Sequence, residues 1–255
     1  MTATEQQAVV GVLGGMGPEA TLELMRRVIA CTPANDDQDH IRMIVDHNPK
    51  VPSRIKALIE KTGESPAPVL AEMARRLEAA GAGVLAMPCN TAHAYAEVIQ
   101  TAVGIPLLDM IGLTARRLSE MPLRHRRVGL LASTAVRSLG LFERALEPFG
   151  ITVTYPGDAD RIMDIIKAVK RGDTGAGQRR ELAAIASELR GTDAQVVACT
   201  ELSVLAAGLE CGTPVLDALD VLAEEIVSWG VGLKKPGARR TVREFHAGQI
   251  IGGGG

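Results

Sequence analysis

Three sequence landmarks occur in the same order in both halves of this chain, and this repetition restricts the folds it can adopt. Each half opens with an apolar run that ends in small residues, at 11–18 and at 129–134. Each then has an apolar run ending in a cysteine, Cys89 or Cys199. A Pro-containing apolar run ending in aspartate follows, with Asp109 20 residues after Cys89 and Asp217 18 residues after Cys199. An ordered triplet is better explained by duplication than by chance, so we expect two related lobes.

Short apolar runs bounded by Gly or Pro alternate with longer helical patterns, which predicts an α/β fold. Several runs are almost continuously apolar, as in parallel strands covered on both faces. The expected strands are 9–13, 41–46, 83–87, 107–109, 127–132, 152–155, 195–199 and 215–217. The expected helices are 18–32, 69–80, 92–102, 111–120, 139–148, 159–171, 177–190 and 218–228. The predicted fold is therefore α/β with two pseudo-symmetric lobes, each a mostly parallel sheet flanked by helices, and a cleft between them.

The predicted lobe boundary lies where the second copy of the pattern begins. We expect lobe 1 to span residues 1–115 and lobe 2 to span 116–221, with a crossover near 217–222 returning the chain to lobe 1. Residues of about 222–245 would then complete lobe 1. The segment 246–255 ends in four glycines and is predicted to be a flexible tail.

Composition excludes several classes of function. The net charge is −2 with acids and bases interspersed, which gives no footprint for nucleic acid or a membrane surface. No apolar stretch approaches the roughly 20 residues of a membrane span. The polar start lacks a signal-peptide core, so a cytoplasmic location is expected. The four cysteines are not closely spaced, which argues against a disulfide framework or a zinc site.

Cys89 and Cys199 are the strongest candidates for catalysis. Open parallel sheets bind ligands beyond the carboxyl ends of their strands, and both cysteines fall at such ends. Both precede predicted helices, whose N-termini stabilise anions, so we expect lowered thiol pKa values. The alternative is that each is a small buried hydrophobe, but their matched settings favour an opposed acid and base that invert a carbon centre. Cys31 and Cys211 lack this setting and are interpreted as structural.

Short polar residues follow each of these cysteines. Asn90, Thr91 and Thr200 can donate hydrogen bonds to a carboxylate or an enolate-like oxygen. Capping of the helices that follow is an equally good interpretation, and it is compatible with ligand contact.

Two ionisable residues also lie close to the cysteines in sequence. His93, one helical turn after Cys89, could tune the thiolate or contact substrate, although a hydrogen-bonded core histidine is the favoured interpretation. Glu201 could accept a proton beside Cys199 or orient its neighbours; the alternative is an exposed acid in the first turn of a helix.

The glycine-rich segment 14–18 resembles a phosphate loop only superficially. It lacks the Gly-x-x-x-x-Gly-Lys-Ser/Thr pattern and the Gly-x-Gly-x-x-Gly fingerprint. We interpret Met16 and Gly17 as a close backbone approach to a small anionic ligand at a helix start, with a plain tight turn as the alternative.

In combination, four motifs resemble those of the aspartate/glutamate racemases, and in particular the aspartate racemase-like branch. The matching segments are 14–21, 47–54, 88–93 and 199–202. The resemblance extends over about residues 8–228. It implies two pseudo-symmetric lobes with the site between them, no cofactor, no metal, a small amino-acid substrate and, in many members, a homodimer.

The resemblance also implies roles for individual residues. It makes Cys89 and Cys199 the two acid/base thiols. Arg54 and Lys170 become candidates for binding the substrate carboxylates, and Ser53 belongs to the same motif as Arg54. Without the resemblance, both cations would be interpreted as ordinary surface residues.

The chain departs from the family pattern at two places. Met16 stands where the glutamate racemase branch carries an Asp-Ser pair, which disfavours that branch. After the fifth strand, many family members carry a Thr-x-Gly-Thr pattern and a nearby Tyr. This chain has Ser133 and Thr134 at that place instead. That part of the pocket is altered, so the resemblance does not imply strict aspartate specificity.

The sequence therefore predicts a cofactor-independent racemase that inverts the α-carbon of aspartate or glutamate by two-thiol proton transfer. Loop amides near Met16, together with Asn90, Thr91, Ser133 and Thr134, would stabilise the substrate carboxylate. Maleate isomerase, hydantoin racemase and arylmalonate decarboxylase relatives are alternatives on the same scaffold. A non-catalytic amino-acid-binding protein is another, and it would need the cleft but not both thiols.

Overall fold

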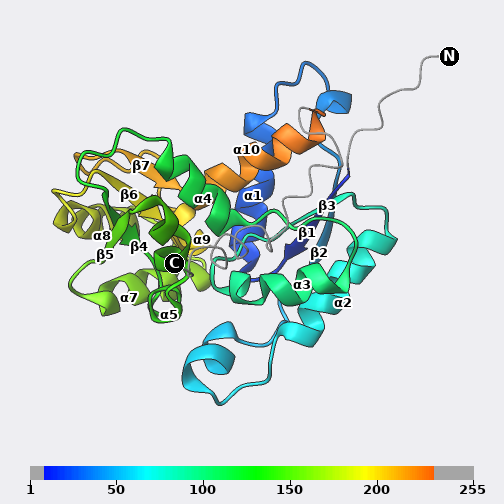
Figure 1. Cartoon of the computed structure of the whole chain (residues 1–255), viewed down its shortest axis with the longest axis horizontal. Helices are drawn as coiled ribbons and strands as arrows, with labels where there is room; N and C mark the ends of the chain where they lie inside the picture. Colours follow the sequence, from blue (N-terminus) through cyan, green and yellow to red (C-terminus); the bar gives the residue numbers. More distant parts are fainter. Residues whose placement is uncertain (1–8, 233–255) are drawn as a thin grey trace, which may run out of the picture.

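Two parallel sheets organise the computed structural model, which describes residues 9–232 (Figure 1). The first sheet has the order β2-β1-β3, with β1 at Val10–Gly14, β2 at Met43–His47 and β3 at Val84–Ala86. The second has the order β5-β4-β6-β7, with β4 at Arg127–Leu131, β5 at Thr152–Thr154, β6 at Ala194–Val197 and β7 at Val215–Asp217. All of these neighbours pair in parallel, which confirms the predicted fold class.

The two sheets have corresponding strand orders, as duplication predicts. The first-sheet counterpart of β7 is a single parallel bridge between Leu85 and Leu107. The predicted strand at 107–109 is therefore reduced to one residue. The cause is local, because Asp109 caps α4 and the chain enters this helix directly after it.

Ten α-helices and four shorter helical turns connect the strands within residues 9–232. The α-helices are α1 (Pro18–Cys31), α2 (Ala67–Ala79), α3 (Ala96–Ala102), α4 (Met110–Ser119), α5 (Thr134–Leu139), α6 (Leu141–Leu146), α7 (Ala159–Lys170), α8 (Ala176–Glu188), α9 (Thr200–Ser203) and α10 (Ala218–Gly230). The shorter turns are η1 (Asp37–Asp39), a π-helical turn η2 (Lys56–Glu60), η3 (Thr91–Tyr95) and η4 (Glu147–Phe149). No helix among these residues is both long and apolar enough to cross a membrane.

The predicted helix at 139–148 is wrong in its start and its continuity. The helical segment begins at Thr134, because Ser133 caps it by accepting a hydrogen bond from the Val136 N–H at 3.3 Å. It then breaks at Gly140, whose φ of 58° lies in the left-handed region that favours glycine. Three helical elements, η1, η2 and α9, have no counterpart among the predicted elements.

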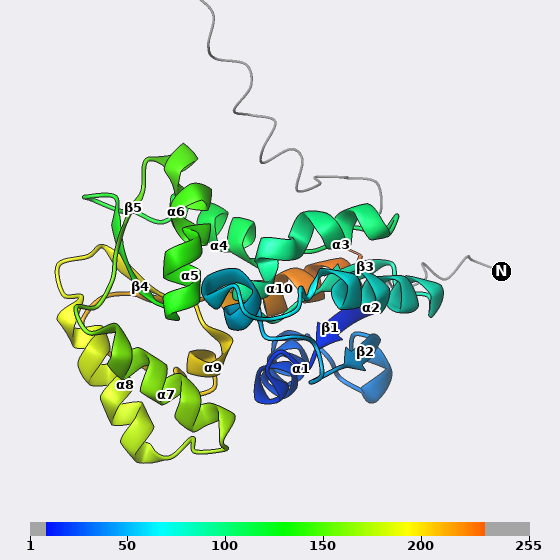
Figure 2. The same ribbon diagram turned by 90° about the horizontal axis from the view of Figure 1, so that it is seen from below.

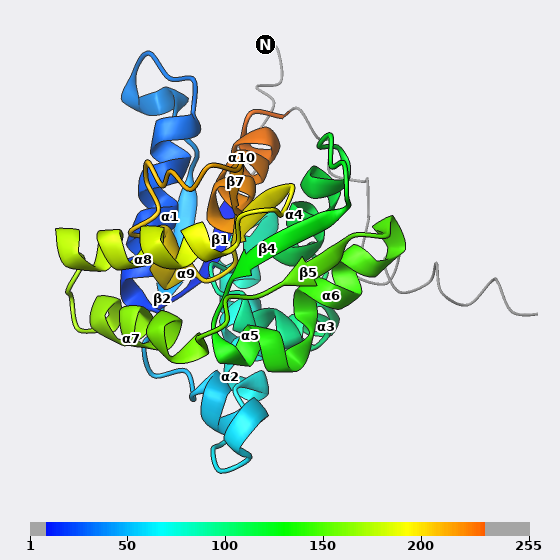
Figure 3. The same cartoon turned by 90° about the vertical axis from the view of Figure 1, so that its left-hand side faces the viewer.

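Helices cover both faces of the second sheet (Figure 3). Alternate residues of β4 face opposite sides, as the pleat requires. Val128 and Leu130 belong to an apolar cluster with α4, α6 and α10, whereas Leu131 belongs to a second cluster with α7 and α8.

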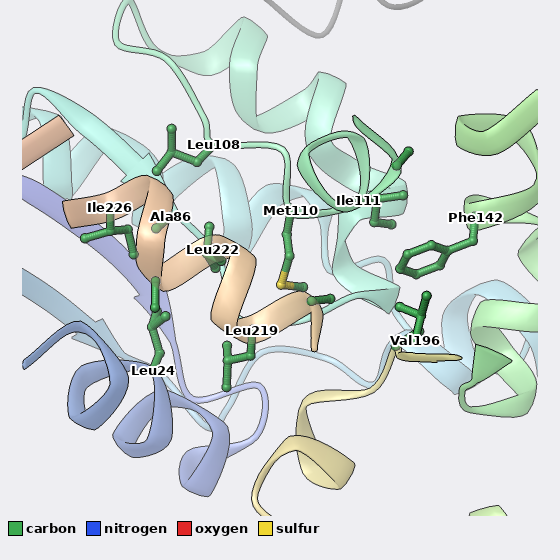
Figure 4. Packing of buried hydrophobic residues seen from close by; sticks show 14 of the residues in the cluster. Leu24, Ala86, Leu108, Met110, Ile111, Phe142, Val196, Leu219, Leu222 and Ile226 are labelled. Atoms are coloured by element: carbon green, nitrogen blue, oxygen red, sulfur yellow. The ribbon is translucent and has the colours of Figure 1, made fainter. Parts of the chain in front are cut away.

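A shared core joins the two halves through α4 and α10. Helix α10 packs against both α1 and α4. Its residues Leu222 and Ile226 lie in one cluster with Leu24 of α1, Met110 of α4 and Phe142 of α6 (Figure 4). Each fully buried side chain of this size contributes about 1.5–3 kcal/mol. Helix α10 thus packs on α1 of the first half, while the predicted crossover near 217–222 and the completion of lobe 1 by about 222–245 stay predictions.

One segment of the first half reaches across to the second. The stretch carrying η2 extends from the first sheet and contacts α5 (Figure 2). It brings Ser53 and Arg54 toward the second half. The predicted lobe boundary at 115/116 falls inside α4 and stays a prediction, and the expected tail at 246–255 lies outside the described residues.

Candidate active site

A pocket of about 510 Å³, counting the space at its open mouth, lies between the two halves. It is lined by side chains that follow β1, β3, β4 and β6 and by side chains of the η2 segment and α7. The lining residues are Met16, Ser53, Arg54, Ile55, Cys89, Asn90, Thr91, Ser133, Val136, Met163, Ile166, Lys170, Ala198, Cys199, Thr200 and Glu201. This is the location expected for a ligand site at the carboxyl ends of parallel strands.

Cys89 and Cys199 both line this pocket, one from each half. Both side chains are buried. A hydrogen bond joins the segments that carry them, because Thr200 Oγ1 donates to the Pro88 carbonyl oxygen at 3.2 Å. Since Thr200 and Pro88 are the immediate neighbours of the two cysteines, this bond holds the cysteine-bearing turns side by side.

The expectation of lowered thiol pKa values is wrong. Burial raises the pKa of Cys89, a trend that Arg54 opposes and Glu201 reinforces. Burial raises the pKa of Cys199 well above its ordinary value, and the Glu201 carboxylate adds to this rise. Backbone N–H groups of Ala92 and Glu201 act in the lowering direction, as a helix start should, but desolvation of the thiolate outweighs them.

Glu201 links Cys199 to a cation. Its Oε2 accepts a hydrogen bond from Cys199 Sγ at 3.1 Å, and its Oε1 lies 3.5 Å from Lys170 Nζ. Glu201 is 8% exposed, which rules out the exposed first-turn acid considered above. A side chain on Gly17 would come within 3.4 Å of Glu201 Oε1, so the first loop closes against this carboxylate.

Asn90 is buried in the pocket wall without hydrogen-bond partners. Its side-chain nitrogen and oxygen are both unsatisfied, although the residue is only 3% exposed. It occupies the N-cap position of η3 but makes no side-chain capping bond. An orphaned buried amide costs about 1–3 kcal/mol per unpaired group, so this side chain is suited to pairing with a bound molecule.

His93 lies outside the pocket lining. Its Nε2 accepts a hydrogen bond from the Met110 N–H at 3.1 Å, which leaves the proton of the neutral ring on Nδ1. Nδ1 is 2.9 Å from the Cys89 carbonyl oxygen and donates to it. Both ring nitrogens are therefore used by backbone groups, in agreement with the core-histidine interpretation and without a contact to the thiol.

The remaining predicted site residues divide into two groups. Met16, Ser53 and Thr91 line the pocket. Gly17 and Thr134 do not, and Thr134 Oγ1 instead donates to Met163 Sδ at 3.6 Å.

Three other predicted site residues in the lining already have partners. Arg54 donates to the Pro52 carbonyl oxygen at 3.1 Å, Ser133 caps α5, and Thr200 bonds to Pro88. Their remaining hydrogen-bonding capacity is what a ligand could use.

The glycine loop serves packing as well as the pocket. Gly15 has φ of 88°, and a Cβ there would lie 2.4 Å from the Asn48 carbonyl carbon. Its N–H donates to Thr21 Oγ1 at 2.8 Å. The tight-turn interpretation therefore applies to Gly15, whereas Met16 faces the pocket.

Sequence analysis missed the apolar part of the lining. These residues are Ile55, Val136, Met163, Ile166 and Ala198. A usable signal existed on α7, because Met163, Ile166 and Lys170 are spaced i, i+3 and i+7 and so share one helix face. The remaining cysteines differ from each other: Cys31 is exposed at the end of α1, and Cys211 is buried. Within residues 9–232, no three His, Cys, Asp or Glu side chains cluster as a metal site.

The fold is that of a two-sheet α/β protein with a pocket lined from both halves, and comparison with known proteins identifies the family. The Asp/Glu/hydantoin racemase family model matches residues 13–226, so the chain belongs to this family.

Individual relatives cover most of the chain. The broad specificity amino-acid racemase RacX of Bacillus subtilis is 26% identical over 86% of this chain and 97% of that protein. The structure of Picrophilus torridus aspartate racemase is 31% identical, with a TM-score of 0.81, over 94% of this chain and 98% of that chain. Glutamate racemase RacE1 from Bacillus anthracis shares the fold, with a TM-score of 0.62 at 16% identity over 88% of this chain and 82% of that chain.

Proposed function

We propose that this protein is a cofactor-independent racemase that inverts the α-carbon of an acidic amino acid, aspartate or glutamate. One observation carries the proposal: two buried cysteines from equivalent positions of the two halves line a single pocket. The names of the relatives support the same class, since RacX is an amino-acid racemase and the Picrophilus protein an aspartate racemase.

The charges of the pocket support an acidic substrate. Arg54 and Lys170 are opposed by one carboxylate in the lining, Glu201, which leaves one positive charge in excess. Ionisation of Cys89 cancels this excess, but the two cations can still each contact one of the two carboxylates of an acidic amino acid. The unpaired Asn90 amide can donate to a carboxylate oxygen and accept from the α-ammonium group.

The environments of the thiols suggest which one starts as the base. Arg54 acts to lower the pKa of Cys89. Cys199 donates a hydrogen bond to Glu201 and has the more strongly raised pKa. Burial raises the pKa of both thiols, but less strongly for Cys89, so we assign Cys89 as the thiol that ionises first, losing its proton to solvent, and Cys199 as the one that stays protonated.

In the proposed reaction, the Cys89 thiolate removes the α-proton, and the C–H electron pair is delocalised into the substrate carboxylate. The Cys199 thiol then protonates the α-carbon from the opposite face. Cys89 finishes as the thiol and Cys199 as the thiolate, which is the starting arrangement for the other enantiomer. Fixed placement of both groups and donors to the carboxylate lower the barrier to removing a weakly acidic proton.

A racemisation screen over the common amino acids, read by chiral chromatography, tests this function. We expect turnover of aspartate or glutamate by the wild-type protein. Cys89→Ala and Cys199→Ala should each abolish racemisation in both directions, because each direction needs both an acid and a base. Full turnover by either variant would refute the two-thiol scheme.

A homodimer and a cytoplasmic location are part of the same proposal. They rest on the resemblance to the racemases. Light scattering coupled to size-exclusion chromatography tests the dimer, and cell fractionation tests the location.

A further inference from the structure

Arg27 of α1 is a buried arginine outside the pocket lining, and it joins the two halves of the molecule. Its side chain is 7% exposed. Nη1 donates to Asp217 Oδ2 at 2.7 Å and to Asp220 Oδ1 at 2.8 Å, at the start of α10. Nε donates to Glu23 Oε1 at 2.8 Å on its own helix. A fourth bond, from Nη2, reaches the Ser203 carbonyl oxygen at 2.5 Å.

Through Ser203, Arg27 contacts the helical turn that carries Cys199. Helix α9 begins directly after Cys199 and ends at Ser203. The Ser203 N–H donates to the Cys199 carbonyl oxygen at 3.1 Å. The Ser203 hydroxyl lies 2.7 Å from Asp217 Oδ1, to which it donates, and 3.4 Å from the same Cys199 oxygen. Arg27 and Asp217 thus hold the end of α9 through Ser203.

The other half secures its cysteine in an equivalent way. His93 lies four residues after Cys89, as Ser203 lies four residues after Cys199. His93 bonds to the Cys89 carbonyl oxygen and to the N–H of Met110, which directly follows Asp109. In both halves, the residue four positions after the cysteine therefore ties the cysteine-bearing turn to the start of a helix, at Asp109–Met110 in the first half and at Asp217 in the second. Within the described part of the chain, only the second half adds a buried charged residue from the opposite half.

We infer that Arg27 is a positioning residue for Cys199, acting through Ser203 and Asp217 on the turn that presents this thiol. The inference deepens the proposed two-thiol function and rests on it. Helix α1 starts just after Met16, which lines the pocket, and Arg27 lies further along the same helix. The bonds of Arg27 consequently set the first-half loop and the second-half thiol relative to each other.

The test compares Arg27→Met with Arg26→Met. Arg26 is the adjacent residue and also bonds to Glu23, but its side chain is 62% exposed and makes no bond to α9. Because Arg27→Met leaves the buried Asp217 carboxylate without its cation, the double variant Arg27→Met/Asp217→Asn is included to remove both charges. The side-chain amide that Asp217→Asn introduces keeps an oxygen that can accept from Ser203 and from the Leu219 N–H.

Two readouts separate positioning from general destabilisation. A misplacement of about 1 Å can cost about 100-fold in rate, so we expect kcat to fall 10- to 100-fold in Arg27→Met and the double variant, with KM within about threefold. The second readout is the rate at which iodoacetamide alkylates each cysteine, measured by peptide mass spectrometry in folded protein. In Arg27→Met and the double variant, the alkylation rate of Cys199 should change at least threefold, while that of Cys89 stays within experimental error. Arg26→Met should change neither rate.

The outcomes are distinguishable. A folded double variant with wild-type kcat and wild-type Cys199 alkylation overturns the inference. Equal changes at Cys89 and Cys199 would also overturn it, since they indicate general loosening. If these variants do not fold, Arg27→Lys replaces them: it keeps the charge but cannot reach Glu23, both aspartates and the Ser203 carbonyl oxygen together, so it should change kcat and Cys199 alkylation in the same way, and no change refutes the inference. Absence of racemisation in the wild type counts against the proposed function alone, because the alkylation comparison needs no turnover.

Discussion

Replacing Glu201 with Gln should make Cys199 more reactive. The substitution keeps the size of the side chain and removes the charge whose oxygen lies 3.1 Å from the Cys199 sulfur. Two unit charges about 4 Å apart interact by about 4 kcal/mol at an effective dielectric constant of about 20. At about 1.4 kcal/mol per pKa unit, this sets a ceiling of about 3 units. Lys170, 3.5 Å from the same carboxylate, already offsets part of the charge, so we expect the pKa of Cys199 to fall by less than this ceiling.

Alkylation by iodoacetamide at pH 8 measures this change. At a pH below the thiol pKa, each unit by which the pKa falls raises the thiolate fraction about tenfold. The nucleophilicity of the thiolate falls at the same time, with a Brønsted coefficient of about 0.4–0.5. The net gain is about threefold per unit, so Cys199 should react about three- to tenfold faster in Glu201→Gln.

Two controls accompany the measurement. Cys89 should gain less than Cys199, because Glu201 makes no hydrogen bond to it. The exposed Glu97→Gln should leave both rates unchanged. If Cys199 is alkylated at an unchanged or slower rate in folded Glu201→Gln protein, the Glu201 carboxylate does not contribute to the raised pKa of Cys199.

Three further predictions concern stability and binding. A thiol whose pKa is raised in the folded state stabilises the protein fully below its unfolded pKa of about 8.5, and above that pH the stabilisation falls by about 1.4 kcal/mol per pH unit. Between pH 8 and pH 10, the free energy of unfolding measured in urea should therefore fall less for Cys199→Ala than for wild type. Equal losses would contradict the raised pKa of Cys199. His93→Ala leaves the Met110 N–H and the Cys89 carbonyl unpaired, so the free energy of unfolding should fall by about 2–5 kcal/mol. A change of less than about 0.5 kcal/mol from wild type, roughly the scatter of surface substitutions, would show that water replaces the ring. Asn90→Leu removes both polar atoms of the amide and should raise KM at least tenfold without lowering the melting temperature; unchanged KM would remove Asn90 from the binding site.

Much of the fold was predictable because its determinants are local or repeated. Continuous apolar runs such as 127–132 and 195–199 predicted parallel strands, and the duplicated landmarks agree with the corresponding strand orders. The break at Gly140 was not predicted, because a lone glycine within a helical pattern does not indicate whether its φ is positive. Helix α9 spans only four residues, too few for a periodic signal.

The site was predictable as a set of residues but not as an environment. The matched settings of Cys89 and Cys199 were enough to predict one shared pocket. Their raised pKa values depend on burial by both halves, which acts against the local effect of the helix starts. The role inferred for Arg27 likewise depends on partners 176 to 193 residues away, which no local pattern indicates.

Isotope incorporation at low conversion tests the central claim most directly. In deuterated water, a single enantiomer of the substrate is incubated with the protein, and both enantiomers are separated and analysed for α-deuterium. Two thiols on opposite faces predict that the product enantiomer carries deuterium, donated by Cys199 after exchange with solvent, while recovered substrate retains its α-hydrogen. A product that carries the original α-hydrogen, or substrate that gains deuterium as fast as product, would show that one group serves both faces and would contradict the account.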